Sequence, residues 1–443
     1  MTAPSCSGQI VDDVSVHRLL VLSNGHGEDA IALRVIRALQ TQPISVEVMA
    51  LPIVGEGSSY VRHNIPIVGP VKAMPSGGFV YMDGKQLARD VRGGLLQLTL
   101  DQIQTVRQWA HVGGSILAVG DIVPLLFGWV SGAPYAFIGT AKSEYYLRDE
   151  HRLLQRSSWF DQLESWSGSV YLPWERGLMR HARCKAVFPR DTLTTNILQR
   201  WPIQVFDVGN PMMDDLTHTD IQQMSTIAQR AQAAARTIVL LPGSRVPEAH
   251  NNWEQILQGV WSMIQHAGDR PQLFLAAIAP SLNLSPFNAL LQQQGWQPIT
   301  DSESVRPSSG YIEFAQGIHR VMVIPGDFNT CIHLADGAIA MAGTATEQVV
   351  GLGKPAFIMP GQGPQFTPAF AEAQTRLLGE SVIFVADPSQ MGECVTNLFT
   401  NPAQLQQIRQ NGHRRMGQPG ASDRIAKTLI QQFGWRRSSS IST

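Results

Sequence analysis

Short apolar runs alternate with helix-like segments along most of the chain, and this alternation limits the fold more than any other feature. In the first half the runs cover 16–23, 44–54, 115–121, 135–140 and 185–189. Such runs are typical of strands buried on both faces, and most segments between them carry apolar residues at helical spacing. The pattern therefore predicts a parallel sheet wrapped by helices.

The alternation pauses in a polar stretch at 217–236 and then restarts. The later strands are expected at 237–242, 273–279, 321–326, 337–343 and 355–361, with a helix from about Glu254. A chain of 443 residues has the length of two ordinary domains or slightly more. The restart therefore predicts a second domain built on the plan of the first.

We predict an α/β fold of two doubly wound, Rossmann-like domains that face each other. The expected boundaries are 1–216 for the first domain, 217–236 for a linker, 237–434 for the second domain and 435–443 for a frayed tail. Ligands of open α/β sheets bind beyond the carboxyl ends of the strands. The function is therefore expected in the cleft between the domains.

The composition excludes several other classes of protein. Its 34 basic and 35 acidic side chains leave a net charge of −1, so no overall field attracts nucleic acid. The cysteines, Cys6, Cys184, Cys331 and Cys394, form no CxxC pair, and neither a metal site nor a disulfide framework is predicted. No stretch reaches the roughly 18 apolar residues of a spanning helix. A cytoplasmic protein is expected.

The loop after the first apolar run reads "SNGHGED", residues 23–29. Gly25 and Gly27 permit a tight turn, and Glu28 suits the positive end of the helix that follows. One interpretation is a plain strand-to-helix turn. The other makes His26 a base at the cleft, because a neutral imidazole accepts a proton near pH 7. The third glycine of a Gly-x-Gly-x-x-Gly motif is missing, so a nicotinamide cofactor is not favoured.

Two later loops are candidates for binding phosphate and ribose, although each also fits an ordinary helix start. In "LLPGSRVPE" small residues precede a helix, so backbone N–H groups and Arg245 can meet a diphosphate. In "MAGTATEQ" Glu347 lies in a first helical turn, where a carboxylate can accept both hydroxyls of a ribose. The predicted substrate-binding residues are Gly25, Gly27, Glu28, Gly243, Ser244, Arg245, Glu248, Gly343, Thr344, Thr346, Glu347 and Gln348.

Asp121 closes the apolar run 115–121. An aspartate in that place is often the cap of the next helix. Because it faces the same cleft as His26, it is also a candidate general base or a residue that holds one in place. The predicted catalytic residues are therefore Asp121 and His26, which compete for one role.

Four motifs, in order, resemble those of lipid-A-disaccharide synthase. "LPGSRVPE" resembles its Pro-Gly-Ser-Arg-x-x-Glu, "AGTATEQ" its Ser-Gly-Thr-Ala-Thr-Leu-Glu and "DVGNPMMDDL" its Val-Gly-His-Pro-Leu-x-Asp, while "NGHGED" stands in the place of its Gly-Glu-x-Ser-Gly-Asp. The last loop also resembles the first loop of the MurG transferase. Together the motifs span nearly the whole chain.

The resemblance implies a GT-B glycosyltransferase with a UDP-linked sugar donor on the second domain, an acceptor on the first, and neither a metal nor a cofactor. Asp121 is the nearest match to that family's important aspartate, without the Asp-Phe-Asn continuation. Glu347 follows Thr346 with no intervening leucine, which shifts the implied ribose contact by one residue. The changed first loop implies a related transferase with a different acceptor.

Two alternatives stay open at this point. The non-hydrolysing UDP-N-acetylglucosamine 2-epimerase shares the GT-B plan, and "GNPMMDDL" is similar to its Gly-Asn-Thr-x-x-Asp, but its His-Arg-Arg-Glu-Asn segment is replaced here by Pro-Gly-Ser-Arg. A binding protein without turnover would keep the same fold and loops.

Residues 157–179 are the candidate for membrane contact. Trp159, Leu163, Trp166 and Val170 share one helical stripe, and such a stripe can lie in a lipid interface or in a core. The resembled enzymes take lipid-linked acceptors, which favours the interface. The expected partners are a nucleotide-sugar donor, a lipid or lipid-linked acceptor, the inner face of a membrane and a second copy in a homodimer.

Overall fold

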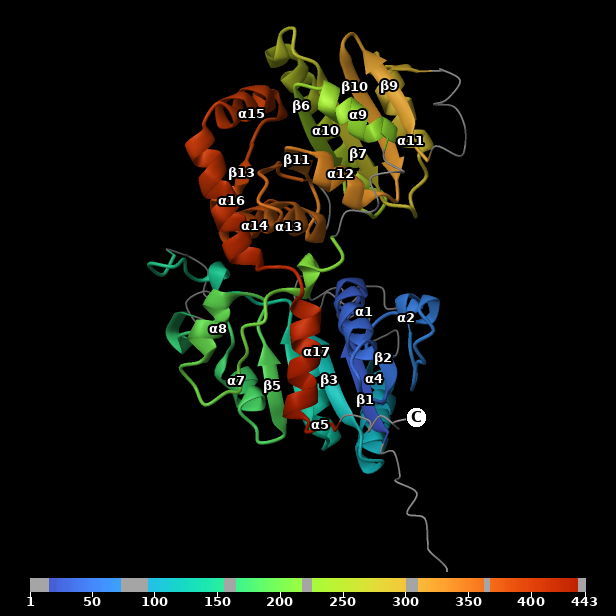
Figure 1. Cartoon of the computed structure of the whole chain (residues 1–443), viewed down its shortest axis with the longest axis vertical. Helices are drawn as coiled ribbons and strands as arrows, with labels where there is room; N and C mark the ends of the chain where they lie inside the picture. The colour runs from blue at the N-terminus through green and yellow to red at the C-terminus, as the bar shows by residue number, and fades with distance from the viewer. Residues whose placement is uncertain are drawn as a thin grey trace, which may run out of the picture.

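The computed structural model describes residues 16–72, 95–154, 165–216, 225–299, 310–361 and 367–436. These residues form two α/β units, one above the other in Figure 1. The predicted class, two Rossmann-like domains that face each other, is confirmed.

The first unit is built on a five-stranded parallel sheet in the order β2-β1-β3-β4-β5. Its strands are β1 (His17–Ser23), β2 (Val46–Pro52), β3 (Ser115–Gly120), β4 (Tyr135–Gly139) and β5 (Cys184–Phe188). The helices around it are α1 (His26–Gln40), α2 (Ser58–Arg62), α4 (Leu95–His111), α5 (Ile122–Ser131), α7 (Pro173–Met179) and α8 (Thr192–Leu198). Each apolar run predicted as a strand in this half contains one.

Both faces of this sheet are covered, which explains why the buried stretches of its strands are almost entirely apolar. Leu20 and Leu22 of β1 pack into a core with α4 and α5, whereas Leu19 and Val21 pack into a second core with α1. Neighbouring residues of a strand point to opposite faces, so a strand between two helical layers needs apolar side chains at every position.

The second unit contains an eight-stranded sheet in the order β13-β12-β11-β6-β7-β10-β9-β8. The parallel strands are β6 (Arg236–Leu241), β7 (Gln272–Ile278), β10 (His319–Pro325), β11 (Gly337–Ala340), β12 (Ala356–Ile358) and β13 (Val382–Phe384). The short β8 (Gln297–Pro298) and β9 (Ile312–Gln316) form an antiparallel edge. This edge and β13 were not predicted, because their runs are too short to stand out.

The helices that follow β6 in the second unit are α10 (Glu248–Ala267), α11 (Ser285–Gln293), α12 (Phe328–Leu334), α13 (Thr344–Gly351), α14 (Pro368–Leu378), α15 (Met391–Phe399) and α16 (Pro402–Met416). The helix expected from about Glu254 begins at Glu248. Its first turns contain the polar residues Asn251 and Asn252, which interrupt the apolar spacing from which the start of the helix was predicted. A further helix, α9 (Ser225–Ala233), lies inside the expected linker.

The last helix, α17 (Ala421–Gln432), packs on the first unit although the expected boundary at 434 assigned it to the second. Ile425, Ala426 and Leu429 are fully buried in the core beside α1, and Figure 1 shows the helix against the lower sheet. Trp435, expected in a frayed tail, stacks on His17 with ring centroids 5.7 Å apart. An apolar stripe predicts a helix but not the sheet that it covers, which explains the difference.

The chain therefore crosses between the units twice, and the two crossings touch. A Cβ placed on Gly417 would lie 3.2 Å from the Gly209 Cα, and both glycines have positive φ. Asp214 accepts hydrogen bonds from the N–H groups of Gly420, Ala421 and Ser422. The "DVGNPMMDDL" motif thus joins the units by capping α17.

Candidate active site between the two units

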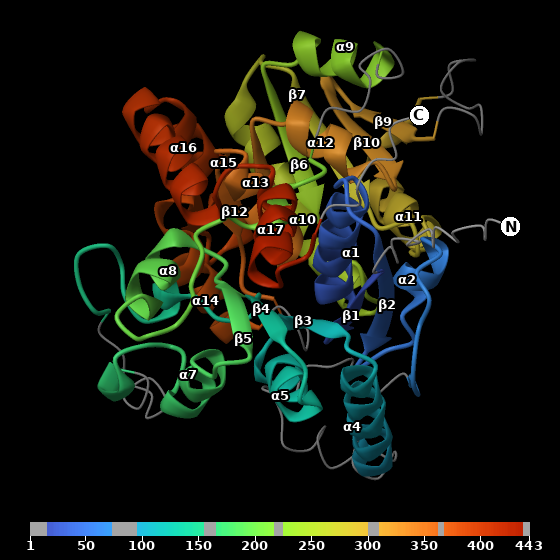
Figure 2. The ribbon, with the colours of Figure 1, turned by 60° about the horizontal axis from the view of Figure 1, so that its bottom comes forward.

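The carboxyl ends of the first sheet point toward the second unit (Figures 1 and 2). One direct contact proves that the two sides meet. The guanidinium of Arg190, just after β5, lies 2.8 Å from the carboxylate of Glu347 in the first turn of α13. This is the edge at which the sequence predicts the function.

The first loop turns as predicted. Gly25 has φ 138°, a conformation that favours glycine, and α1 begins at the next residue. The loop is held from below by Asp29, which accepts a hydrogen bond of 2.6 Å from the Ser23 hydroxyl, while Tyr60 donates to that hydroxyl at 2.7 Å. The side chain of His26 lies outside the described residues. Its role as a base stays a prediction.

Glu28 points back toward the sheet. The Thr140 hydroxyl, at the end of β4, donates to Glu28 Oε1 at 3.2 Å. Burial raises the pKa of Glu28, and the negative charges of Asp121 and Asp29 raise it further. The role of Glu28 in binding substrate stays a prediction.

Asp121 caps α5 and stays beside the first loop. Its Oδ1 accepts a hydrogen bond of 2.9 Å from the N–H of Val123. A Cβ on Gly120 would lie 3.3 Å from the Asn24 Cβ and 3.4 Å from the Glu28 Cγ, so β3 ends against the first loop. Burial raises the pKa of Asp121 despite the Val123 hydrogen bond. The structure thus shows Asp121 as a helix cap, and its role as a base stays a prediction.

An ion pair missed by the sequence analysis sits next to Asp121. Lys142 Nζ lies 2.7 Å from the buried Glu175 carboxylate and donates to the carbonyl of Val170 at 3.0 Å. The charge of Glu175 raises the pKa of Asp121 and that of Lys142 lowers it. The only sequence signal was a polar run directly after an apolar one, which is common.

On the second unit, the loop between β6 and α10 presents its predicted residues to the surface. Gly243 has φ 101°, Ser244 and Arg245 are exposed, and Glu248 is buried in the first turn of α10. The fully buried Asn252, also missed, donates to the carbonyls of Pro242 at 3.0 Å and Met341 at 3.4 Å. One amide therefore ties together the two loops predicted to hold the donor.

The loop before α13 is only partly open. Gly343 precedes the helix and Thr344 is exposed. The buried Thr346 donates its hydroxyl to the carbonyl of Ala342, and Gln348 donates to the carbonyl of Met212 at 3.0 Å. In this structure Thr346 and Gln348 thus bond to the protein backbone rather than facing open space.

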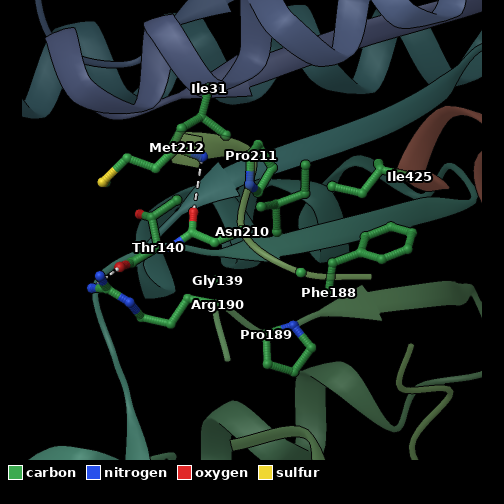
Figure 3. Close-up of a pocket in the computed structure, with 12 residues that line it drawn as sticks. Ile31, Gly139, Thr140, Phe188, Pro189, Arg190, Asn210, Pro211, Met212 and Ile425 are labelled. Carbon is green, nitrogen blue, oxygen red and sulfur yellow. Dashed lines mark hydrogen bonds between the residues drawn. The ribbon is translucent and has the colours of Figure 1, made fainter. Parts of the chain in front are cut away.

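Glu347 is held by the opposite unit. Arg190, which is 8% exposed, donates one N–H to Glu347 and another to the carbonyl of Thr140 at 2.9 Å. Figure 3 shows Arg190 reaching Thr140 at the rim of a small pocket formed by the ends of β4 and β5 and the crossing segment 209–212. Sequence reasoning missed Arg190, because a basic residue after a strand is no motif.

The segment 157–179 does not form the predicted stripe. Trp166 is 79% exposed, whereas Val170 is buried in the first core; the chain turns at Gly168, which has positive φ. Trp159 and Leu163 lie outside the described residues. Within the described ranges no helix is long and apolar enough to cross a membrane, and no three His, Cys, Asp or Glu side chains converge as metal ligands would.

No protein-family model matches the chain, and no curated protein matches it in sequence. Its fold is similar to that of a putative UDP-N-acetylglucosamine 2-epimerase from Listeria monocytogenes, with a TM-score of 0.55 and 13% identity over 95% of this chain and 97% of that chain. It is also similar to that of MurG from Acinetobacter baumannii, with a TM-score of 0.53 and 16% identity over 94% of this chain and 99% of that chain. S. aureus MnaA, solved with UDP, has a TM-score of 0.53 and 11% identity over 96% of this chain and 98% of that chain. The chain has the GT-B fold.

Proposed function

We propose that the protein is a glycosyltransferase related to lipid-A-disaccharide synthase, which moves a sugar from a UDP-linked donor to a lipid or lipid-linked acceptor without a metal ion or cofactor. The observation that carries the proposal is a pair of carboxylates at the carboxyl edge of the first sheet, an edge that the Arg190–Glu347 contact of 2.8 Å joins to the second unit. Two partly buried carboxylates with raised pKa values, Glu28 and Asp121, lie on one unit, and the exposed loop Gly243–Arg245 opens on the other.

The second unit would hold the donor. The loop 242–245 precedes α10, so its N–H groups and the positive end of the helix suit a diphosphate, and the Arg245 guanidinium adds a forked cation. When the bond between the sugar and the diphosphate breaks, the electron pair leaves with the diphosphate. The same donors stabilise that charge as it develops.

The first unit would activate the acceptor. Asp121 takes the proton from an acceptor hydroxyl, and the oxygen then forms its bond to the anomeric carbon of the sugar. A base works best when its pKa lies near the working pH, so the raised pKa of Asp121 favours this role. His26 remains the competing candidate.

Arg190 gives the donor site a second state. A ribose can reach both oxygens of Glu347 only after the Arg190 contact of 2.8 Å opens. The guanidinium that is released stays at the same edge, bonded to the Thr140 carbonyl. We therefore expect nucleotide binding to loosen this link between the units.

Turnover of a panel of UDP-sugars tests the function. The acceptor comes from comparing the lipids of cells with and without the protein, and the variants are D121N and R245A. Loss of turnover in both supports the proposal, with D101N, at a half-buried residue of α4, and R18A, at an exposed residue of β1, as matched controls. Parent-like rates in both variants would overturn it.

An isomerase is the second candidate, because one of the similar structures is that of a putative UDP-N-acetylglucosamine 2-epimerase. Proton NMR of UDP-N-acetylglucosamine with the protein and no acceptor separates the two. Accumulation of the manno isomer would replace the transferase by the epimerase. Stabilisation by UDP without product from any acceptor would instead indicate a binding protein.

The lipid side of the proposal rests on exposed aromatic residues of the first unit. Trp166 and Trp174 are 79% and 56% exposed, and on the adjoining α5 Leu126 and Trp129 are 41% and 38% exposed. Aromatic rings favour the headgroup level of a membrane. Co-sedimentation with anionic liposomes should drop for W166A/W174A but not for W261A, a matched exposed tryptophan on the second unit. Equal binding by all three proteins would remove this surface from the proposal.

A further inference from the structure

A second pocket lies at the amino ends of the strands of the second sheet, on the side opposite to the loop 242–245. It opens where β6 and β7 begin, between the end of α10 and the packed helix α15; both helices are labelled in Figure 1. The residues that line it are Ala235, Arg236, Met263, His266, Ala267, Arg270, Gln272, Gly392, Val395 and Thr396. None of these described residues is acidic, and three carry basic side chains.

Arg236 is the most constrained of the three. Its half-buried guanidinium stacks on the Phe399 ring at 4.2 Å. Among the described residues, its guanidinium meets no hydrogen-bond acceptor and no carboxylate at ion-pair distance. Asp336 attracts it from a distance, but one oxygen of that carboxylate already accepts from the Thr237 N–H at 2.8 Å. Burial lowers the pKa of Arg236, and the charge of Arg270 lowers it further.

The other two basic side chains of the pocket each make one hydrogen bond within the described part of the protein. Arg270 has one long hydrogen bond of 3.5 Å, from its Nε to the carbonyl of Ala267. His266 donates through Nδ1 to the carbonyl of Ser262 at 2.8 Å, so Nε2 of the neutral ring is an acceptor rather than a further donor. Two guanidiniums and an imidazole thus surround one opening whose described lining supplies no negative charge.

We propose that this pocket binds a tetrahedral oxyanion, inorganic phosphate or the phosphate group of a small monoester. A half-buried cation without an acceptor costs free energy, and a second cation beside it adds repulsion. A doubly charged oxyanion removes both costs, because guanidinium groups bind it through paired hydrogen bonds. The site is separate from the donor loop, since the 20 residues of α10 span about 30 Å between them.

Titration calorimetry of the full chain with inorganic phosphate tests the site. All proteins carry R245Q, so that the cleft loop does not contribute. We expect the R245Q protein to bind phosphate, and R236Q/R270Q in that background to weaken binding at least about tenfold, the loss of two charged hydrogen-bonding groups. R409Q, an exposed arginine on α16, is the matched control and should change nothing. No binding by the R245Q protein, or equal binding with and without R236Q/R270Q, overturns the proposal.

Further variants and a second ligand extend the titration. R270Q alone alters an exposed side chain and should weaken binding several-fold while the unfolding midpoint in phosphate-free buffer stays unchanged; parent-like affinity in this folded variant contradicts the proposal. R270K keeps the charge but not the fork, and should also bind more weakly. Glycerol 3-phosphate replaces phosphate in a parallel titration: the tighter of the two ligands identifies the source of the anion.

Discussion

The two units carry their candidate site residues in different ways. On the first unit the polar groups are side chains that other parts of the chain hold in place: Glu28 by Thr140, and Asp121 by the start of α5. On the second unit the predicted binding groups are a short loop with Ser244 and Arg245 exposed. Burial shifts the pKa of a carboxylate, as a general base would require, whereas a loop that is to bind a diphosphate must keep its donors accessible.

The largest effect should come from the buried side. We expect D121N to lower kcat about a thousandfold, within the usual range for removing a general base, while the Kd for UDP stays unchanged. Steady-state kinetics and calorimetry with UDP check the two parts. A parent-like kcat in D121N would transfer the role of base to His26, and H26Q is the variant that then should lose turnover.

The contact between the two sides should give the next largest effect. R190Q breaks the ion pair with Glu347, whose side chains are 7% and 11% exposed, and should lower the free energy of unfolding by about 3 kcal/mol, since one charge remains buried. The apolar pair R190M/E347L should recover most of that loss. Urea unfolding of the parent, R190M, E347L and R190M/E347L measures the coupling between the two side chains. Additive losses would show that the two residues do not stabilise each other.

These residues also show where prediction from the sequence ends. The strands and the loops at 25–28, 242–245 and 343–347 follow from local patterns: a buried run, then glycine, then a helix. Arg190 and Asn252 have no local signature, because their roles come from atoms 157 and 89 residues away in the chain. The packing of α17 on the first unit was missed for the same reason, since an apolar stripe does not name its partner.

Loss of the exposed arginine should have a smaller effect. R245A removes a charged hydrogen bond to the diphosphate, worth about 2 kcal/mol, and should raise the Kd for UDP about thirtyfold. Because Arg245 is exposed, the unfolding midpoint without nucleotide should not change. D121N is the matched control, with UDP affinity like the parent. If R245A binds UDP as the parent does, the diphosphate is held elsewhere and the contrast between the two sides fails.

The smallest effect, and the sharpest in sign, concerns the charges beside Asp121. A base must lose its proton before it acts, so kcat/KM should fall as the pH drops through the pKa of Asp121, which burial holds above the ordinary value of an aspartate. Glu175 raises that pKa and Lys142 lowers it. E175Q should therefore move the acidic limb of the pH profile to lower pH, and K142M should move it to higher pH. D101N, at a half-buried residue of α4, should leave the limb in place. Shifts of the same sign, or no shift in either variant, would mean that the group titrating in the profile is not Asp121, even if D121N is inactive.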